Sequence, residues 1–172
     1  MRFRGTCYRA HDPRWAFTPL SGDGARLHGG RFNRIGTPAL YLSLSLSGMF
    51  AEMSHGFAHR FPPLMVITYE VNVDDIVDLR TQSRRRRARV ALKDLACAWE
   101  LDHSNGVEPA SWRIADRLIR EGAAGILVPS FATHATQKMR NLVLWRWGSE
   151  LPHRVQVYDP GDRLPRDQSS WK

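Results

Sequence analysis

Strand-like and helix-like segments follow one another in this sequence without a regular β-α-β alternation. Extended, β-branched or apolar runs occupy residues 3–9, 39–43, 64–73, 76–79, 125–129, 141–147 and 155–158. Helical periodicity is found over residues 45–59, 88–99 and 109–121. This order favours an α+β domain with a bent, mainly antiparallel sheet and flanking helices. No Walker loop is present and no G-x-G-x-x-G follows a strand, so a nucleotide would bind without either motif.

The composition is that of one folded domain. The chain has 172 residues, of which 42% are hydrophobic and 24% charged. We expect a domain over residues 1–159 and a tail over 160–172, where apolar residues are few. The first residues lack the apolar segment of a signal peptide, and serines interrupt the apolar stretch at 39–50. With only Cys7 and Cys97 as cysteines, the sequence predicts a cytoplasmic protein without a disulfide framework.

Positive charge dominates the chain, and the net charge of +8 attracts anions of any kind. Much of the excess lies between Arg80 and Arg89, with an unbroken run from Arg84 to Arg87. Such a run is typical of a solvated loop or helix edge. Two alternatives stay open: a nucleic-acid-binding module that uses Arg80–Arg89, or a docking surface for an acidic protein segment.

The helix expected over residues 45–59 has an apolar stripe at the 3, 4 and 7 spacing of one buried face. The stripe consists of Leu46, Met49, Phe50, Met53 and Phe57. Glu52 lies away from it and shares a face with His55 and His59. These three residues also raise the alternative of a zinc site, but their spacing is not H-E-x-x-H and no fourth ligand is evident. We therefore expect no metal.

Two further helices are expected in the second half of the chain. The one over 88–99 would bury Leu92, Leu95, Ala96 and Trp99, and the one over 109–121 would bury Trp112, Ala115, Leu118 and Ile119. The second helix is clearly delimited, because Pro109 suits a first turn and Gly122 suits the residue after a helix end.

Three side chains have complementary uses on a dinucleotide. Arg31 follows a double glycine and can pair with a diphosphate, Tyr41 is on a strand and can stack on a flat ring, and Glu52 is on a helix. The nicotinamide–ribose bond of NAD breaks to leave an oxocarbenium-like sugar, which a carboxylate stabilises. Together the three residues predict a catalytic site that binds and cleaves NAD.

Each of these residues, taken singly, also has an ordinary structural explanation: a surface arginine, a core aromatic and a solvated helix carboxylate. Ser130 lacks the G-x-S-x-G elbow of a hydrolase nucleophile, so a phosphate or ribose contact suits it better.

Several motifs taken in order resemble the RES-domain family, the toxin halves of bacterial RES–Xre toxin–antitoxin pairs. They are Tyr8-Arg9, residues 29–33 (GGRFN), residues 36–41 (GTPALY), Glu52, residues 125–130 (GILVPS) and residues 140–144 (RNLVL). Phe32 stands where the family more often has tryptophan, and the loop over 131–138 departs from the family pattern.

This resemblance implies an ADP-ribosyltransferase-like fold with a split sheet, and NAD as substrate. The implied activities are NAD degradation by water or phosphate, or ADP-ribosyl transfer to a protein target. By the same resemblance Glu52 is the catalytic carboxylate, Arg31 and Tyr41 bind NAD, and Ser130, Arg9 and Asn141 belong to the same cleft. The implied partner is an Xre-like antitoxin, with a homodimer inside the toxin–antitoxin complex.

Overall fold

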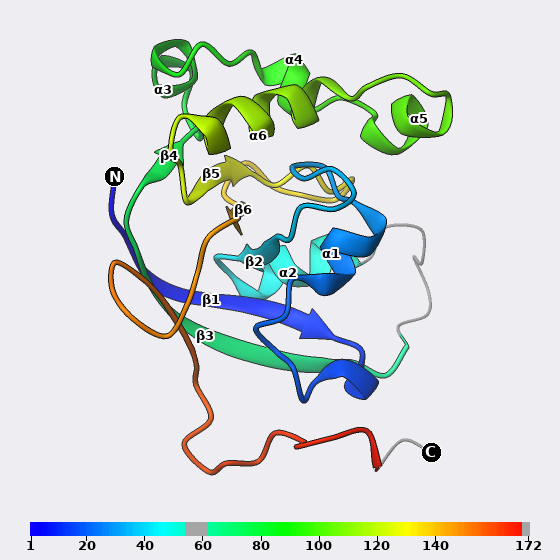
Figure 1. Ribbon diagram of the computed structural model, residues 1–172, viewed down its shortest axis with the longest axis vertical. Coiled ribbons are helices and arrows are strands. Elements are labelled where there is room, and N and C mark those ends of the chain that lie inside the picture. Colours follow the sequence, from blue (N-terminus) through cyan, green and yellow to red (C-terminus); the bar gives the residue numbers. More distant parts are fainter. Residues whose placement is uncertain (54–61, 170–172) are drawn as a thin grey trace.

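One seven-stranded sheet forms the centre of the computed structural model, which describes residues 1–53 and 62–169 (Figure 1). The strands lie in the order β4-β5-β6-β2-β1-β3-β7. Their bounds are Phe3–His11 (β1), Leu40–Ser43 (β2), Met65–Val73 (β3), Ile76–Asp78 (β4), Gly125–Pro129 (β5), Arg140–Leu144 (β6) and His153–Val157 (β7). β4 and β5 pair in parallel, whereas every other neighbouring pair is antiparallel. The expected α+β class with a mainly antiparallel sheet is therefore confirmed.

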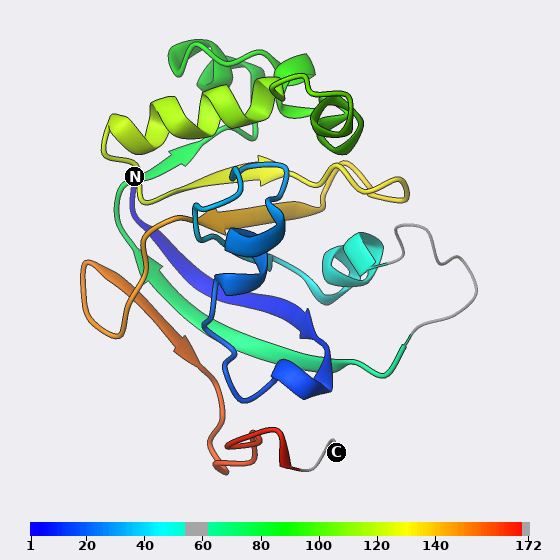
Figure 2. The same ribbon diagram turned by 45° about the vertical axis from the view of Figure 1, so that its right-hand side comes forward.

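The sheet consists of two halves joined at a single point. β1 pairs with β3 along its whole length, from Phe3 opposite Val73 to His11 opposite Met65. β1 pairs with β2, however, only where Tyr8 lies opposite Ser43. Figure 2 shows β1 and β3 curving away beneath β5 and β6. The two halves diverge beyond the Tyr8–Ser43 pair.

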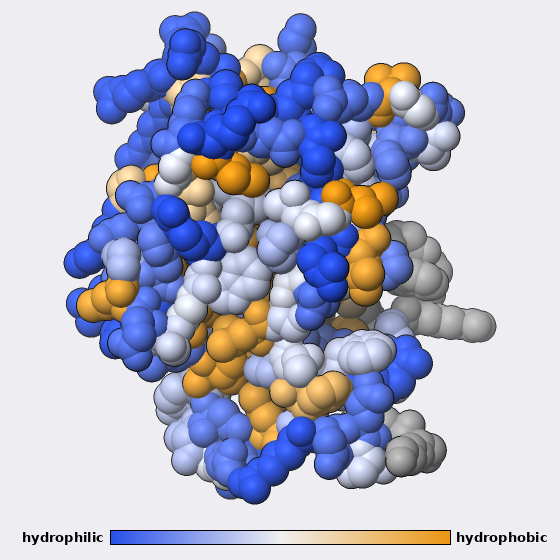
Figure 3. Space-filling model, in the orientation of Figure 1, coloured by the Kyte–Doolittle hydropathy of each residue, from blue (hydrophilic) through white to orange (hydrophobic). Residues whose placement is uncertain are grey.

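Helices cover the two halves of the sheet differently. Their bounds are Asp23–His28 (α1), Leu46–Met53 (α2), Gln82–Arg87 (α3), Leu92–Leu95 (α4), Trp99–Ser104 (α5) and Ala110–Arg120 (α6), with a 3₁₀ turn over Pro13–Trp15. α3 to α6 lie above β4 and β5 in Figure 1, and much of this end is hydrophilic in Figure 3. α2 contacts both β1 and β2. Over residues 1–53 and 62–169, no helix has the length and apolar character needed to cross a membrane.

The core has two parts because side chains alternate across the sheet. Leu142 and Leu144 of β6 pack in one cluster with buried residues of β1, β3 and β7. Val143, between them in sequence, packs in the other cluster with Ile126 of β5 and Leu118 of α6. This alternation is the period of two expected for a strand that is buried on both faces.

The helix expected over residues 109–121 is confirmed as α6. Its chain enters at Pro109 and leaves at Gly122, whose φ of 92° is easily adopted only by glycine. Trp112, Ala115 and Leu118 are buried, as the spacing predicted, and they dock the helix on the sheet.

The single helix expected over residues 88–99 is wrong. The chain instead forms α3, α4 and α5, three short helices separated by breaks. Thr81 caps α3 by accepting a hydrogen bond from the Arg84 backbone N–H, and Arg89 adopts a φ of 55°, which ends the helical path. Leu95 is buried as expected, but Leu92 is 46% exposed. The arginine run therefore belongs to a helix of its own.

The helix expected over 45–59 is described only as far as Met53, because residues 54–61 lie outside the described part of the chain. Its buried face differs from the predicted stripe. Gly48, Met49 and Ala51 are buried, whereas Leu46 is 47% and Phe50 is 45% exposed. The buried face of α2 is therefore centred on Met49 rather than on the predicted stripe.

The last strand begins two residues earlier than expected, and β6 ends at Leu144 rather than at Trp147. After β6, the indole N–H groups of Trp145 and Trp147 donate hydrogen bonds to the carbonyls of Phe32 and Leu20. In the segment after β7, Leu164 packs against the first core cluster.

Candidate active site

A cavity of about 440 Å³ opens between α1, α2, α5 and the end of the split sheet. Arg31, Tyr41 and Glu52 all line it, together with Arg9 of β1. Three separate segments therefore deliver the three predicted residues to one recess. Its volume is within the range of roughly 300–1,000 Å³ that is usual for small-molecule sites.

Arg31 is held in place by uncharged partners. Its Nη1 donates to the carbonyl oxygen of Cys97 at 2.5 Å and to that of Leu95 at 3.4 Å. Its Cζ lies 5.3 Å from the centre of the Phe131 ring. Burial lowers the pKa of the guanidinium, which nevertheless stays charged, as arginine does in proteins. Within residues 1–53 and 62–169 Arg31 forms no ion pair, so its charge is available to an anionic ligand.

Tyr41 is fixed through its hydroxyl group. The hydroxyl donates to Oδ1 of Asn33 at 2.7 Å and accepts from the backbone N–H of Phe32 at 2.9 Å. Burial raises the pKa of the phenol far above its usual range, so the hydroxyl keeps its proton. With the hydroxyl engaged, the half-buried ring is what Tyr41 offers to a ligand.

The backbone of Gly30 lies so close to the Tyr41 hydroxyl that a side chain at this position would clash. A Cβ atom on Gly30 would lie 2.6 Å from the Tyr41 hydroxyl oxygen and 2.8 Å from Oδ1 of Asn33. The indole N–H of Trp112 donates to the Gly30 carbonyl at 2.7 Å and holds the turn against α6.

Glu52 is half-buried and has one carboxylate oxygen engaged twice. Oε1 accepts from the Ser130 hydroxyl at 2.5 Å and from Nδ2 of Asn141 at 2.6 Å. Asn141 is itself held by its place in β6, opposite Ser43. Ser130 after β5 and Asn141 in β6 thus orient this carboxylate through Oε1, and neither of them donates to Oε2.

A smaller cavity of about 200 Å³ adjoins the first and lies where β1 and β2 separate. Arg9, Tyr41 and Glu52 line both cavities. Nη1 of Arg9 donates to the Ser21 carbonyl at 3.2 Å, and burial lowers the pKa of this guanidinium. Two half-buried arginines, Arg9 and Arg31, therefore face the combined recess together with the carboxylates of Glu52 and Glu100.

Ser130 and Asn141, predicted to contact NAD, are placed at the site as partners of Glu52. Asn141 lines the smaller cavity, whereas Ser130 lines a different hollow. Their contact with a ligand stays a prediction, as do the catalytic and binding roles of Arg31, Tyr41, Glu52 and Arg9.

Several residues of the site were not predicted as site residues from the sequence. Asn33 anchors the Tyr41 hydroxyl, although it lies in a motif that was noted only for its neighbours. Phe131, Trp99 and Glu100 line the larger cavity from segments far away in sequence. Only the tertiary fold brings these walls together.

No group of three or more His, Cys, Asp or Glu residues is arranged to hold a metal ion over residues 1–53 and 62–169. His55 and His59, which raised the zinc alternative with Glu52, lie outside the described residues.

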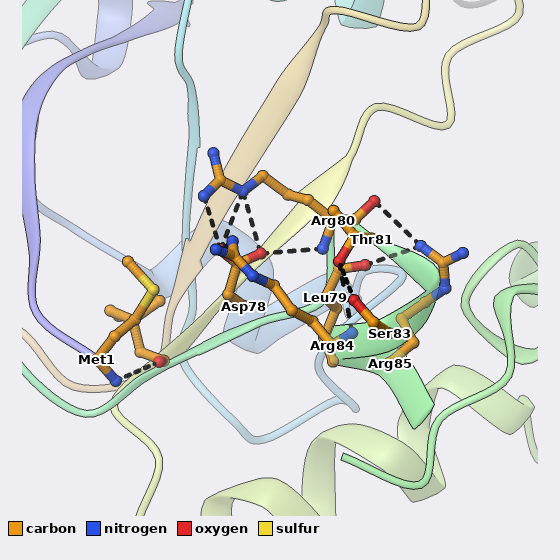
Figure 4. Close-up of polar contacts among 9 residues, drawn as sticks. Met1, Asp78, Leu79, Arg80, Thr81, Ser83, Arg84 and Arg85 are labelled. Atoms are coloured by element: carbon orange, nitrogen blue, oxygen red, sulfur yellow. Dashed lines mark hydrogen bonds and ion pairs between the residues drawn. The ribbon is translucent and has the colours of Figure 1, made fainter. Parts of the chain in front are cut away.

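The arginine run lies away from these cavities and is partly neutralised. Asp78, whose side chain is only 6% exposed, pairs with both Arg80 and Arg84. Burial opposes the charge on this carboxyl, but the hydrogen bonds from Arg80 outweigh it and lower the pKa. Figure 4 shows Arg80 and Arg84 converging on Asp78. Arg86 and Arg87 remain exposed.

Comparisons with known proteins identify the family and the fold of this chain. The sequence model of the RES domain matches residues 6–167. A chain of the crystal structure of the M. tuberculosis MbcT–MbcA toxin–antitoxin complex is similar in fold, with a TM-score of 0.61 and 21% sequence identity. The match covers 92% of this chain and 84% of that chain. A comparison with curated protein sequences finds no match.

Proposed function

The chain belongs to the RES domain family, as its motifs indicated, and from this premise we propose that it is a toxin that consumes NAD. The proposed reaction cleaves the nicotinamide–ribose bond, either to degrade NAD or to transfer ADP-ribose to a protein target. One observation carries this proposal: Arg31, Tyr41 and Glu52 line the same cavity.

In the proposed reaction, Arg31 binds the diphosphate. It is already oriented by the carbonyls of Cys97 and Leu95, which do not neutralise its charge. Such preorganisation reduces the entropy lost when the ligand binds. The ring of Tyr41 packs against the nicotinamide, because its hydroxyl is already occupied by Asn33 and Phe32.

Glu52 stabilises the positive charge that develops on the ribose as nicotinamide leaves. Ser130 and Asn141 hold Oε1, so the carboxylate does not have to reorient during the reaction. The nicotinamide ring leaves as a neutral molecule, and therefore no strong general acid is required.

The proposed partner is an Xre-like antitoxin, with a toxin homodimer inside the complex. Support comes from family membership and from the similarity to a chain of a toxin–antitoxin complex. Co-expression with such an antitoxin should give a stable complex in which NAD cleavage is suppressed.

The proposal is tested by incubating the purified protein with NAD, with and without phosphate, and following nicotinamide release by chromatography. We expect release by the parent protein, and a loss of at least a hundredfold in Glu52→Gln, in line with the removal of one electrostatic stabiliser. Glu150→Gln is the matched control, because Glu150 is exposed and remote from the cavity lining.

Mass spectrometry of the products would identify the acceptor as water, phosphate or a protein side chain. If no nicotinamide and no ADP-ribosylated product formed, the proposed reaction would be wrong. If Glu52→Gln retained full activity, Glu52 would have no part in it.

A further inference from the structure

A further hollow of about 500 Å³ begins at Ser130 and Phe131, shares Phe131 with the larger cavity, and is lined by arginines. Four segments surround it: the connection from β4 into α3, the helix α4 with the residue after it, the loop after β5, and the start of β6. They contribute Arg80, Arg85 and Arg140. Among the described residues that line this hollow there is no carboxylate. Arg80 is paired with Asp78, and the positive charges of Arg85 and Arg140 in one hollow favour an anionic ligand.

Arg85 and Arg140 are oriented but not neutralised. Nη1 of Arg85 donates to the carbonyls of Leu79 and Arg80, both at 3.1 Å, and Nη1 of Arg140 donates to its neighbour's carbonyl at 2.8 Å. In Figure 4 Arg85 points away from Asp78, which is engaged by Arg80 and Arg84. Over the described ranges neither Arg85 nor Arg140 forms an ion pair.

Neutral hydrogen-bonding groups complete the wall. Thr136 and Gln137 line the hollow from the loop after β5, and within residues 1–53 and 62–169 their side chains make no hydrogen bond. Guanidinium groups with hydroxyl and amide groups beside them match the oxygen atoms of a phosphate group.

We infer that this hollow binds the phosphate group of a small phosphorylated molecule, at a site distinct from the NAD cavity. Phe131 is the single aromatic residue among its described lining, so no row of rings is present on which nucleic-acid bases would stack.

Isothermal titration with inorganic pyrophosphate tests this inference. Pyrophosphate is also expected to bind at Arg31 in the proposed NAD cavity, so the site at the hollow is the one that persists in Arg31→Ala. We expect the affinity of that site to fall by about tenfold or more in Arg85→Gln and in Arg140→Gln, as for the loss of a charge-assisted hydrogen bond. Arg120→Gln, an exposed change on α6, is the charge-matched control and should bind as the parent does. Arg31→Ala should also retain this site, because Arg31 lines the other cavity.

A second variant guards against misfolding. Gln137→Glu places a negative charge at the hollow without removing a structural contact, and it should weaken pyrophosphate binding to a similar extent. The measurement is repeated on Glu52→Gln, so that it does not depend on NAD cleavage.

Three results would overturn the inference: no binding, binding indifferent to all three changes at the hollow, or binding lost only in Arg31→Ala. A single-stranded oligonucleotide is titrated in parallel. If it alone bound, and Arg86→Gln with Arg89→Gln abolished its binding, the arginines would form a nucleic-acid surface and the small-ligand site would be rejected.

Discussion

Individual residues at the cavity are oriented by partners that leave the group proposed to act on the ligand available. Carbonyl oxygens orient Arg31 without neutralising its charge. The hydroxyl of Tyr41 is engaged, so its ring is the part that can contact a ligand. Glu52 has two donors on Oε1. Each of these arrangements reduces the reorganisation needed when a ligand binds or reacts.

Gly30 tests how tightly the Tyr41 hydroxyl is packed. Gly30→Ala would place a methyl group 2.6 Å from that oxygen, so we expect a loss of roughly 1–3 kcal/mol in the free energy of unfolding. Gly24→Ala is the matched control in α1, because a Cβ there meets nothing within 4 Å. It should be neutral or stabilising by up to about 1 kcal/mol. Urea denaturation measures both, and equal midpoints for the two variants would contradict the proposed packing.

His11 makes the stability of the β1–β3 half dependent on pH. Its side chain is buried, its Nε2 lies 2.7 Å from the Tyr69 hydroxyl, and burial with nearby Arg9 lowers its pKa to about 4. Between about pH 6.5 and pH 4 the unfolded chain therefore binds more protons than the folded one, and stability falls as the pH falls. The free energy of unfolding that His11 contributes, and that is lost over this pH interval, is on the order of 3 kcal/mol.

Denaturation between pH 6.5 and pH 4.5 tests this assignment. We expect His11→Asn to lose less stability than the parent over that interval. Parallel curves for the two proteins would assign the pH dependence to other groups.

At the scale of elements, the arginine run shows how one buried charge organises a short helix. α3 begins after Thr81, and Asp78 at the end of β4 holds Arg80 before the helix and Arg84 within it. A cluster that the sequence presents as a solvated charge run is thus tied at one side to the sheet. Arg86 and Arg87 remain exposed, and Arg85 lines the hollow that it shares with Arg140.

Removal of the Asp78 charge should loosen this connection. Asp78→Asn keeps the size of the side chain but leaves Arg80 and Arg84 without their carboxylate, and we expect a loss of about 1–3 kcal/mol of stability. Asp94→Asn on α4 is the control, because Asp94 makes no ion pair within the described part of the chain. If chemical denaturation gave the two variants the same midpoint, Asp78 would not anchor α3.

The whole molecule is organised around the divergence of the two sheet halves. Within the described residues, β1 and β2 pair only where Tyr8 lies opposite Ser43, and the recess lies beside that pair with α2 across it. A ligand in this position contacts β1 from one half and β2 from the other. Binding should therefore restrain the halves relative to each other.

Hydrogen–deuterium exchange of the Glu52→Gln protein with NAD tests this arrangement. We expect slower exchange in residues 8–10, 24–31 and 41–53, which belong to both halves and to the helices over the recess. The interior of β5 should change little, because it is already buried in the core. Protection confined to α3 and the loop after β5 would place NAD elsewhere and contradict the proposed site.

The sequence by itself determined the local structure and the chemistry available. Extended, β-branched or apolar runs predicted the strands, Pro109 and Gly122 delimited α6, and ordered motifs identified the RES family. These features depend on neighbouring residues, so they can be read from a linear pattern.

The arrangement of the site was decided only by the tertiary structure. Asn33 and Ser130 owe their contacts with Tyr41 and Glu52 to chain segments that meet through packing, and sequence spacing does not encode such contacts. Local patterns also misjudged residues 88–99 and the buried face of α2, because tertiary packing and a helix-ending φ at Arg89 override helical periodicity. A site built at the junction of two sheet halves exists only once both halves have folded.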